Sequence, residues 1–297
     1  MSNTKEGINT LLAWVAKQGI PLDQLHVMME ATGIYHEIAA MTLFDAKVKL
    51  SVVNPAQARN FARSMGIRTK NDKVNSAVLA RFGASMRPLA WQPLPREVRE
   101  LRVLLSRREA VAADLLRERN REEKTKAAAT ISQSVIKSIN CAIEFLEVEL
   151  ARLQKEIKNH IGRHPNLKED RELLISIPGV GPQVSNTLLS IIIGGSFDSA
   201  EQLAAYLGLV PVENKSGTSV SGRPHPSKTG PSHARAILYM AAVVAIRHNP
   251  HIKSLYERLL AKGKCKMSAL GAAMRKLVHL CFGVLKTRTP YRVDYSN

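Results

Sequence analysis

The sequence predicts an α/β domain followed by a longer all-α region, and three observations support this. Strand and helix patterns alternate over residues 9–82, an apolar seam at spacings of three and four residues runs over 136–157, and two helical patterns flank a Pro-Gly-Val-Gly turn at 178–181. The 297 residues leave room for two domains and a connector. We therefore expect an α/β domain at 1–92, a coiled coil at 93–164 and a helical C-terminal domain at 165–297.

Helices and strands in the first domain follow one another at the spacing of a parallel or mixed sheet. The expected elements are a helix at 9–17, a strand at 24–29, a helix at 36–46, a strand at 48–53, and helices at 56–64 and 71–82. Pro55 can occupy the first turn of the helix that follows the second strand, because that position needs no N–H donor.

Two acidic residues stand at the ends of these elements. Glu30 closes the first strand and Asp72 opens the helix at 71–82, and ligand sites gather at such ends along one edge of an α/β sheet. The two carboxylates could hold Mg²⁺ for phosphodiester chemistry. Alternatively, Asp72 is a helix N-terminal acid and Glu30 a surface charge, and spacing alone favours this plainer explanation.

Two long amphipathic helices follow, over 98–115 and 136–157. They are expected to pack as an antiparallel hairpin, although the seam could equally join two protomers. The other faces of the first helix are rich in arginine, and this surface is either solvated or follows a nucleic-acid backbone. The arginines are Arg99, Arg102, Arg107, Arg108, Arg117, Arg119 and Arg121.

A polar linker is expected at 162–170, followed by a helix–hairpin–helix pattern over 173–190. Gly179 and Gly181 allow a sharp turn and leave backbone amides at the N-terminus of the helix from Pro182, where a DNA phosphate can bind. The alternative is a bare helical hairpin without a ligand. Further helices are expected at 199–206, 234–247 and 267–285.

A loop is expected at 214–235, because its glycines and prolines exclude a continuous helix or central strand. It combines hydroxyl side chains with four basic residues and has no carboxylate, which suits phosphate oxygens. The four are Lys215, Arg223, Lys228 and Arg235. A solvated surface loop is the alternative.

Charge supports a nucleic-acid partner. The chain has 43 Lys and Arg against 25 Asp and Glu, a net charge of +18, and residues 214–292 hold fifteen bases and one acid. No apolar run approaches the ~18 residues of a membrane span, so we expect a cytoplasmic protein without membrane contact. Its three cysteines are widely spaced, and we expect ordinary buried or half-buried thiols.

Six ordered motifs resemble the DEDD-type insertion-sequence transposases, a family that includes pilin-gene invertases and bridge-RNA-guided recombinases. The motifs are Met-Glu-Ala-Thr-Gly-Ile-Tyr at 29–35, Val-Val-Asn-Pro at 52–55, Arg-Thr-Lys-Asn-Asp at 68–72, Ile-Pro-Gly-Val-Gly at 177–181, Leu-Ala-Ala-Tyr-Leu-Gly-Leu-Val-Pro at 203–211 and Lys-Ser-Gly-Thr-Ser at 215–219.

The resemblance implies a RuvC-like (RNase H-fold) domain, here without its first strands, a coiled coil and a C-terminal transposase domain. It implies that Glu30 and Asp72 bind Mg²⁺ and that Ser216 attacks a DNA phosphate to form a phosphoserine intermediate. Implied partners are DNA, a guide RNA and further copies of the chain, as a homodimer or homotetramer.

Two departures from the family pattern weaken the expected metal site. The family's fourth acid should stand three residues after Asp72, where this chain has Asn75, and its first Asp would lie before the start of this sequence. Asn75 can offer a carbonyl oxygen but no charge, so weak Mg²⁺ binding is expected. Three hypotheses follow: a recombinase acting through Ser216, a catalytically defective remnant that binds DNA or RNA, and an RNA-binding scaffold.

Overall fold

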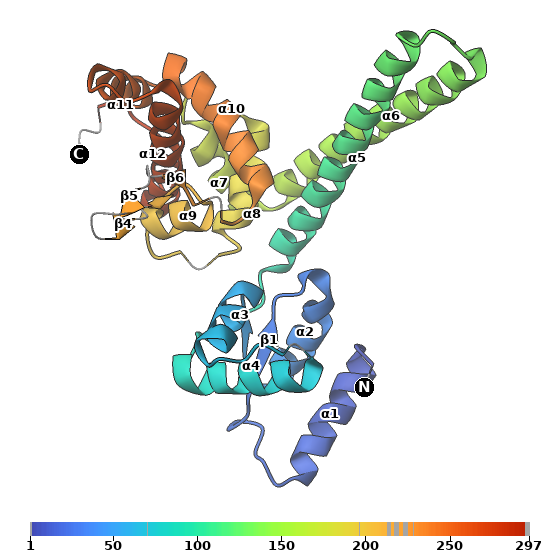
Figure 1. The fold of residues 1–297 in the computed structure, drawn as a ribbon, viewed down its shortest axis with the longest axis vertical. Coiled ribbons are helices and arrows are strands. Elements are labelled where there is room, and N and C mark those ends of the chain that lie inside the picture. Colours follow the sequence, from blue (N-terminus) through green and yellow to red (C-terminus); the bar gives the residue numbers. More distant parts are fainter. Residues whose placement is uncertain are drawn as a thin grey trace. The chain divides into compact units, whose positions relative to one another are not determined.

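The computed structural model describes residues 2–69, 71–195, 197–212, 215–216, 220–221, 225–227 and 229–294, with the backbone alone at 215–216, 220–221 and 225–226. The chain forms two compact units, Met1–Pro93 and Leu94–Asn297 (Figure 1). The coiled coil and the C-terminal helices therefore share one unit. The three-domain division expected from the sequence stays a prediction.

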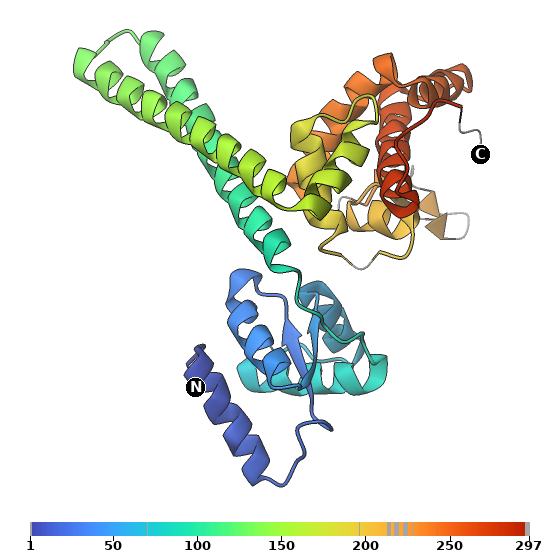
Figure 2. The ribbon, with the colours of Figure 1, turned by 180° about the vertical axis from the view of Figure 1, so that it is seen from behind.

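The first unit is a small α/β domain. Its elements are α1 Lys5–Lys17, β1 His26–Glu30, the 3₁₀ helix η1 Gly33–His36, α2 Glu37–Asp45, β2 Lys49–Val53, α3 Pro55–Ser64 and α4 Asp72–Met86. β1 and β2 pair in parallel, with Glu30 opposite Val53. α2 packs against β2 and α4 against β1 (Figure 2). The expected alternation of strand and helix and the parallel pairing are confirmed.

Two asparagine caps set where α3 and α4 begin. Asn54 Oδ1 accepts a hydrogen bond from Ala56 N at 2.8 Å, and Pro55 occupies the first turn of α3 as expected. Asn71 Oδ1 accepts from Val74 N at 2.8 Å. Each cap satisfies an otherwise unpaired N–H group in the first turn of its helix.

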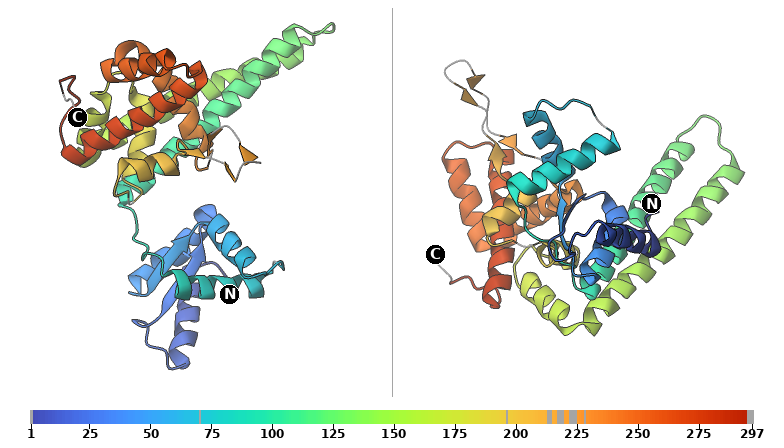
Figure 3. Two further views of the ribbon diagram at one scale, coloured as in Figure 1. Left: turned by 60° about the vertical axis from the view of Figure 1, so that its left-hand side comes forward. Right: turned by 90° about the horizontal axis from the view of Figure 1, so that it is seen from below.

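In the second unit, α5 Arg96–Lys126 and α6 Gln133–Arg163 pack side by side as an antiparallel hairpin (Figure 3). Ile139, Leu153 and Ile157 of the expected seam are buried. The seam therefore closes within one chain, as the hairpin hypothesis predicts. Near the base of the hairpin, Leu101 and Ile161 join the main core of the unit.

The arginine-rich face of α5 carries many ion pairs. Arg117 pairs with Asp114, Arg121 with Glu118, and Arg119 reaches Glu147 of α6 at 2.6 Å. Neighbouring carboxylates thus neutralise three of the seven arginines, which favours the solvated-face interpretation at these three positions.

The remaining helices surround a buried centre. They are α7 Pro165–Ile175, α8 Pro182–Ile192, α9 Ala200–Tyr206, α10 Ser232–His248, α11 Pro250–Ala261 and α12 Lys266–Thr287. Among the described residues, α12 is the one helix long and apolar enough to cross a membrane by length and composition. It packs against α9, α10, α11 and α7, and Leu277, Val278 and Cys281 are fully buried, so α12 is a core helix.

Several expectations from the sequence are wrong. The linker at 162–170 is absent, because α6 continues to Arg163 and α7 begins at Pro165 after a single extended residue, with Leu167 buried against the core. The polar side chains there face solvent on helices. α11 was not foreseen, and the expected loop ends early, because α10 starts at Ser232.

The prediction that the cysteines are buried or half-buried is confirmed for one of the three. Cys281 is buried, and burial raises the pKa of its thiol to about 12, so it behaves as an inert core residue. Cys141 and Cys265 are exposed rather than buried.

A buried polar network ties the helix junctions together. Asn249 is fully buried; its Nδ2 donates to Pro178 O at 3.3 Å, and its Oδ1 accepts from Ile252 N at 3.2 Å and from the Tyr291 hydroxyl at 3.0 Å. One side chain therefore joins the turn after α7, the start of α11 and the segment after α12.

We predict that Asn249→Ala lowers the free energy of unfolding by about 2–4 kcal/mol. The substitution removes the cap of α11 and leaves its buried polar partners without a hydrogen bond. Urea unfolding followed by circular dichroism measures this loss. Tyr291→Phe is the matched control, since it removes one hydroxyl and should cost about 1 kcal/mol. Equal effects of the two substitutions would contradict a network centred on Asn249.

Candidate functional site

A pocket of about 750 Å³ opens at the carboxyl edge of the β1–β2 sheet in the first unit. Its lining contains Glu30 from the end of β1, residues along α3 from Pro55 to Arg63, the turn after α3, and Asn75 and Val78 of α4. The end of β1 is fixed by Ala31 N, which donates to Val53 O at 2.9 Å. This is the edge at which parallel sheets bind ligands.

The structure brings two of the three predicted metal-binding residues to this pocket. Glu30 is half-buried, and Asn75 lies on the first turn of α4, where its N–H donates to Asn71 O at 2.8 Å. Asp72 is the first residue of α4 as expected, but it is exposed and does not belong to the described lining of the pocket. The assignment of Glu30, Asp72 and Asn75 to a metal stays a prediction.

The pocket also contains residues that the sequence reasoning missed. Arg59, Arg63 and Arg68 line it, so its described wall carries three guanidinium groups and one carboxylate. Arg59 and Arg63 stand four residues apart on α3 and therefore share a face of that helix. This spacing, directly after the Asn-Pro cap, was the signal in the sequence.

The described residues do not complete a magnesium site. Mg²⁺ prefers octahedral oxygen ligands and usually keeps several waters beside one or two carboxylates. Within the described part of the chain, no group of three or more His, Cys, Asp or Glu side chains comes together. Glu30 and Asn75 supply suitable oxygens, but the three arginines that line the same pocket oppose a bound cation.

The second candidate region is the turn between α7 and α8. Gly179 has φ +100°, and a Cβ atom there would lie 2.6 Å from Ala245 Cβ of α10. Gly181 is the N-cap of α8, and a Cβ there would meet nothing within 4 Å. Gly179 is thus required for packing, whereas Gly181 leaves the first N–H groups of α8 without a side-chain cap.

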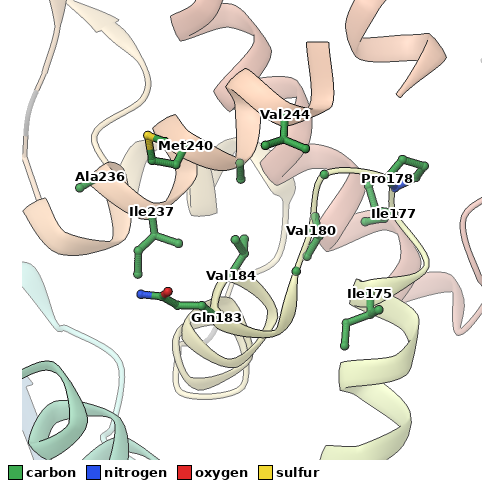
Figure 4. A pocket seen from close by; sticks show the side chains of 13 residues that line it. Ile175, Ile177, Pro178, Val180, Gln183, Val184, Ala236, Ile237, Met240 and Val244 are labelled. Carbon is green, nitrogen blue, oxygen red and sulfur yellow. The ribbon is translucent and has the colours of Figure 1, made fainter. Parts of the chain in front are cut away.

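An apolar groove lies beside this turn, between α8 and α10. Figure 4 shows Val180 and Val184 on one side and Met240 and Val244 on the other. None of the described residues that line the groove is charged. A phosphate at the α8 N-terminus would therefore depend on backbone amides, and the role of Gly179 and Gly181 as DNA contacts stays a prediction.

The serine segment forms short antiparallel strand pairs. β3 Pro211–Val212 pairs with β6 His225–Pro226, and β4 Lys215–Ser216 pairs with β5 Val220–Ser221. Ser216 is paired with Val220 through the backbone. The side chains of Lys215 and Ser216, and all of Arg223 and Lys228, lie outside the described residues.

Arg235 anchors the end of this segment. Its Nη1 donates to Thr229 O at 2.9 Å and to Gly230 O at 3.0 Å. On the same first turns of α10, His233 Nε2 lies 2.7 Å from Glu109 Oε1 of α5. Arg235 therefore holds backbone carbonyls at the start of α10, and a DNA contact through this residue stays a prediction.

The chain is similar over almost its whole length to two curated proteins. It is 33% identical over 292 residues to the pilin gene-inverting protein of Moraxella bovis, which covers 98% of this chain and 89% of the relative, and equally similar to that of Moraxella lacunata. Residues 1–125 match a family described as a transposase of the DEDD, IS110 type, and residues 171–257 match the Transposase IS116/IS110/IS902 family. The chain belongs to the IS110 family of transposases.

A more distant relative shares part of this transposase. A 43.6 kDa protein of insertion element IS110 from Streptomyces coelicolor is 28% identical over 158 residues, 53% of this chain and 38% of the relative. The first family match contains the pocket at the β1–β2 edge, and the second contains the α7–α8 turn, the serine strands and α10. Both candidate regions thus lie inside the segments that define the family.

We predict that Gly179→Ala in this transposase lowers the free energy of unfolding by about 2–4 kcal/mol, because Ala is strained at φ +100° and would clash with Ala245. A Cβ atom at Gly181 would meet no other atom within 4 Å, so the free energy of unfolding of Gly181→Ala should stay within about 1 kcal/mol of the parent value. Thermal unfolding of the two variants side by side checks this. A neutral Gly179→Ala would show that the turn does not depend on its contact with α10.

Proposed function

We propose that this transposase recombines DNA by cutting and rejoining strands at Ser216, and that it acts on a DNA segment by inversion or insertion. The observation that carries the proposal is the similarity, over 98% of the chain, to proteins named for inverting a pilin gene. Inverting a DNA segment requires that its ends be cut and then joined again. An enzyme that keeps the phosphate in a covalent bond suits this task.

The proposed chemistry balances without an external energy source. The Ser216 hydroxyl oxygen attacks the phosphorus of a DNA phosphodiester, its proton passes to solvent, and a DNA hydroxyl leaves with a proton. The phosphoserine bond conserves the phosphodiester, so a second DNA hydroxyl can reverse the step at a new position. The Lys-Ser-Gly sequence supports this choice of serine, because Gly217 permits close approach of a phosphate.

Basic residues around Ser216 are proposed to neutralise the phosphoryl oxygens. Lys215, Arg223 and Lys228 are close in sequence to the serine, and charge on the phosphate oxygens must be offset as the phosphorus is attacked. Arg235 contributes differently in this proposal. Its bonds to Thr229 O and Gly230 O hold the end of the serine segment against α10.

Transposases of the DEDD type typically use a divalent metal, and the family resemblance implies Mg²⁺ at Glu30, Asp72 and Asn75. Asp72 lies outside the described lining of the pocket, and we propose that Glu30 and Asn75 do not hold Mg²⁺ tightly by themselves. The neutral amide of Asn75 and the arginines in the pocket support weak rather than tight binding. The same observation favours a second candidate function: a catalytically defective protein that keeps DNA or RNA binding. A covalent DNA adduct distinguishes the two, because only the recombinase forms one.

We further propose that the protein is cytoplasmic and works as a homodimer or homotetramer. Support for self-association comes from the α5–α6 hairpin, which exposes Leu116, Phe145 and Val148, with Phe145 67% and Val148 71% accessible. Phe145 and Val148 stand one turn apart on α6 and so share a face. A guide RNA is proposed on the family resemblance alone.

We predict that the chain carrying Asn75→Asp forms a covalent protein–DNA adduct with a nicked DNA substrate that contains the end sequences of an insertion element of this family. In that chain, Ser216→Ala should abolish the adduct and change DNA affinity less than about twofold. Denaturing gel electrophoresis with labelled DNA detects the adduct. Ser227→Ala is the matched control and should keep it. Loss of the adduct in Ser227→Ala together with its persistence in Ser216→Ala would refute the assignment of Ser216. If the Asn75→Asp chain itself forms no adduct, the result favours a protein that binds DNA or RNA without chemistry.

We also predict that DNA affinity falls at least tenfold between 50 and 200 mM salt, because the basic excess of residues 214–292 neutralises several phosphates. The second unit alone, residues 94–297, should keep most of this dependence, since its core is contained within it. Fluorescence anisotropy at several salt concentrations measures both. Salt dependence that resides mainly in residues 1–93 would contradict the proposal.

A further inference from the structure

We propose that the pocket at the β1–β2 edge is a phosphate-binding site for the DNA backbone, formed by Arg59, Arg63 and Arg68. The inference rests on the family's action on DNA, but it does not depend on the chemistry proposed for Ser216. It assigns a binding role to Arg59 and Arg63, which lie outside the sequence motifs, and to Arg68, which begins one of the motifs but does not belong to the expected metal site.

The three arginines converge through the local structure of α3. Arg59 and Arg63 point from one face of the helix, and the chain then turns back at Gly66, which has φ +72°. In this turn Gly66 N donates to Arg63 O at 3.0 Å and Ile67 N to Ala62 O at 3.0 Å. The turn brings Arg68 back along α3 to the wall that the other two arginines form.

The charges of these arginines are not neutralised inside the described part of the chain. Arg59, Arg63 and Arg68 make no ion pair or side-chain hydrogen bond with any described residue, and all three are exposed. The arginines of α5 differ, because Arg117, Arg119 and Arg121 each pair with a carboxylate. The pocket therefore presents three available guanidinium groups.

A phosphodiester is the ligand that this arrangement fits. Guanidinium groups bind phosphate oxygens with paired, directional hydrogen bonds, and several on one wall can share one anionic group or two successive ones. A cation would instead have to bind beside three positive charges with one carboxylate for compensation.

Substitution of Glu30 should change phosphate affinity in opposite directions for an arginine site and for a metal site. The Glu30 carboxylate lines the same pocket, so it repels a bound phosphate, and Glu30→Gln should tighten phosphate binding. If the pocket bound phosphate through Mg²⁺, Glu30→Gln would remove a metal ligand and weaken binding.

The test is protection of arginines from phenylglyoxal in the full chain, with pyrophosphate or a short single-stranded oligodeoxynucleotide as the probe and a chelator present. Peptide mass spectrometry measures the labelling of each arginine. We expect labelling of Arg59, Arg63 and Arg68 to fall at least fivefold at a probe concentration that changes Arg81 labelling less than twofold. Arg81 is the matched control, because it is exposed on α4 of the same unit but lies outside the pocket wall.

In Glu30→Gln, half-protection should occur at a pyrophosphate concentration at least threefold lower. Uniform protection of all arginines, Arg81 included, would overturn the proposal, because it would indicate a general ionic atmosphere. Protection that requires Mg²⁺ and is lost in Glu30→Gln would overturn it in favour of a metal site. If Glu30→Gln does not fold, the protection pattern of the parent chain decides alone. Adduct formation at Ser216 is measured separately, so failure of either proposal can be told from failure of the other.

Discussion

The close approach of the α7–α8 turn to α10 is the constraint on which the second unit depends. Gly179 lies against Ala245, and Asn249, at the end of the same helix, donates to Pro178 O. Two independent contacts, one steric and one polar, thus hold the turn to α10. The core helices α8, α10 and α12 meet behind this contact, and the serine strands are attached to the N-terminal end of α10.

The position of the serine segment follows from this arrangement. Arg235 holds Thr229 O and Gly230 O at the first turn of α10, and Ser227 N donates to Val210 O at 3.1 Å. The segment is therefore held by a backbone bond to Val210 and by the Arg235 side chain, while the residues around Ser216 are rich in glycine and cations. A rigid frame that carries a permissive loop is a common way to place a reactive side chain against a large substrate.

The basic residues of the chain differ in whether a nearby acidic side chain neutralises them. On α5, basic side chains pair with acids on the same helix or on α6. At the β1–β2 edge and in the C-terminal region, bases outnumber nearby acids. Net charge alone predicts a nucleic-acid partner, but only the ion-pair pattern separates structural cations from those available for a ligand.

Much of the fold could be read from local patterns, because helices, strands and caps depend on residues that are near one another in sequence. Apolar spacing located β1, β2 and the α5–α6 hairpin, and Asn-Pro at 54–55 located the start of α3. The same reasoning failed at 162–170, where a polar segment is helical because Leu167 reaches the core. Polarity by itself does not distinguish a linker from a helix with one buried face.

For the candidate sites, too, some features could be predicted from the sequence and others required the tertiary structure. The sequence by itself determined the family, the glycine turn, and the placement of Glu30 at the end of β1 and Asp72 at the start of α4, because these rest on motifs and element order. Only the tertiary structure decided that Gly179 is required by Ala245, that Arg235 binds backbone carbonyls, and that three arginines of α3 and its following turn line the same pocket as Glu30. The physical reason is that packing distance, hydrogen-bond partners and unpaired charge are set by residues far apart in sequence, and no local pattern contains them.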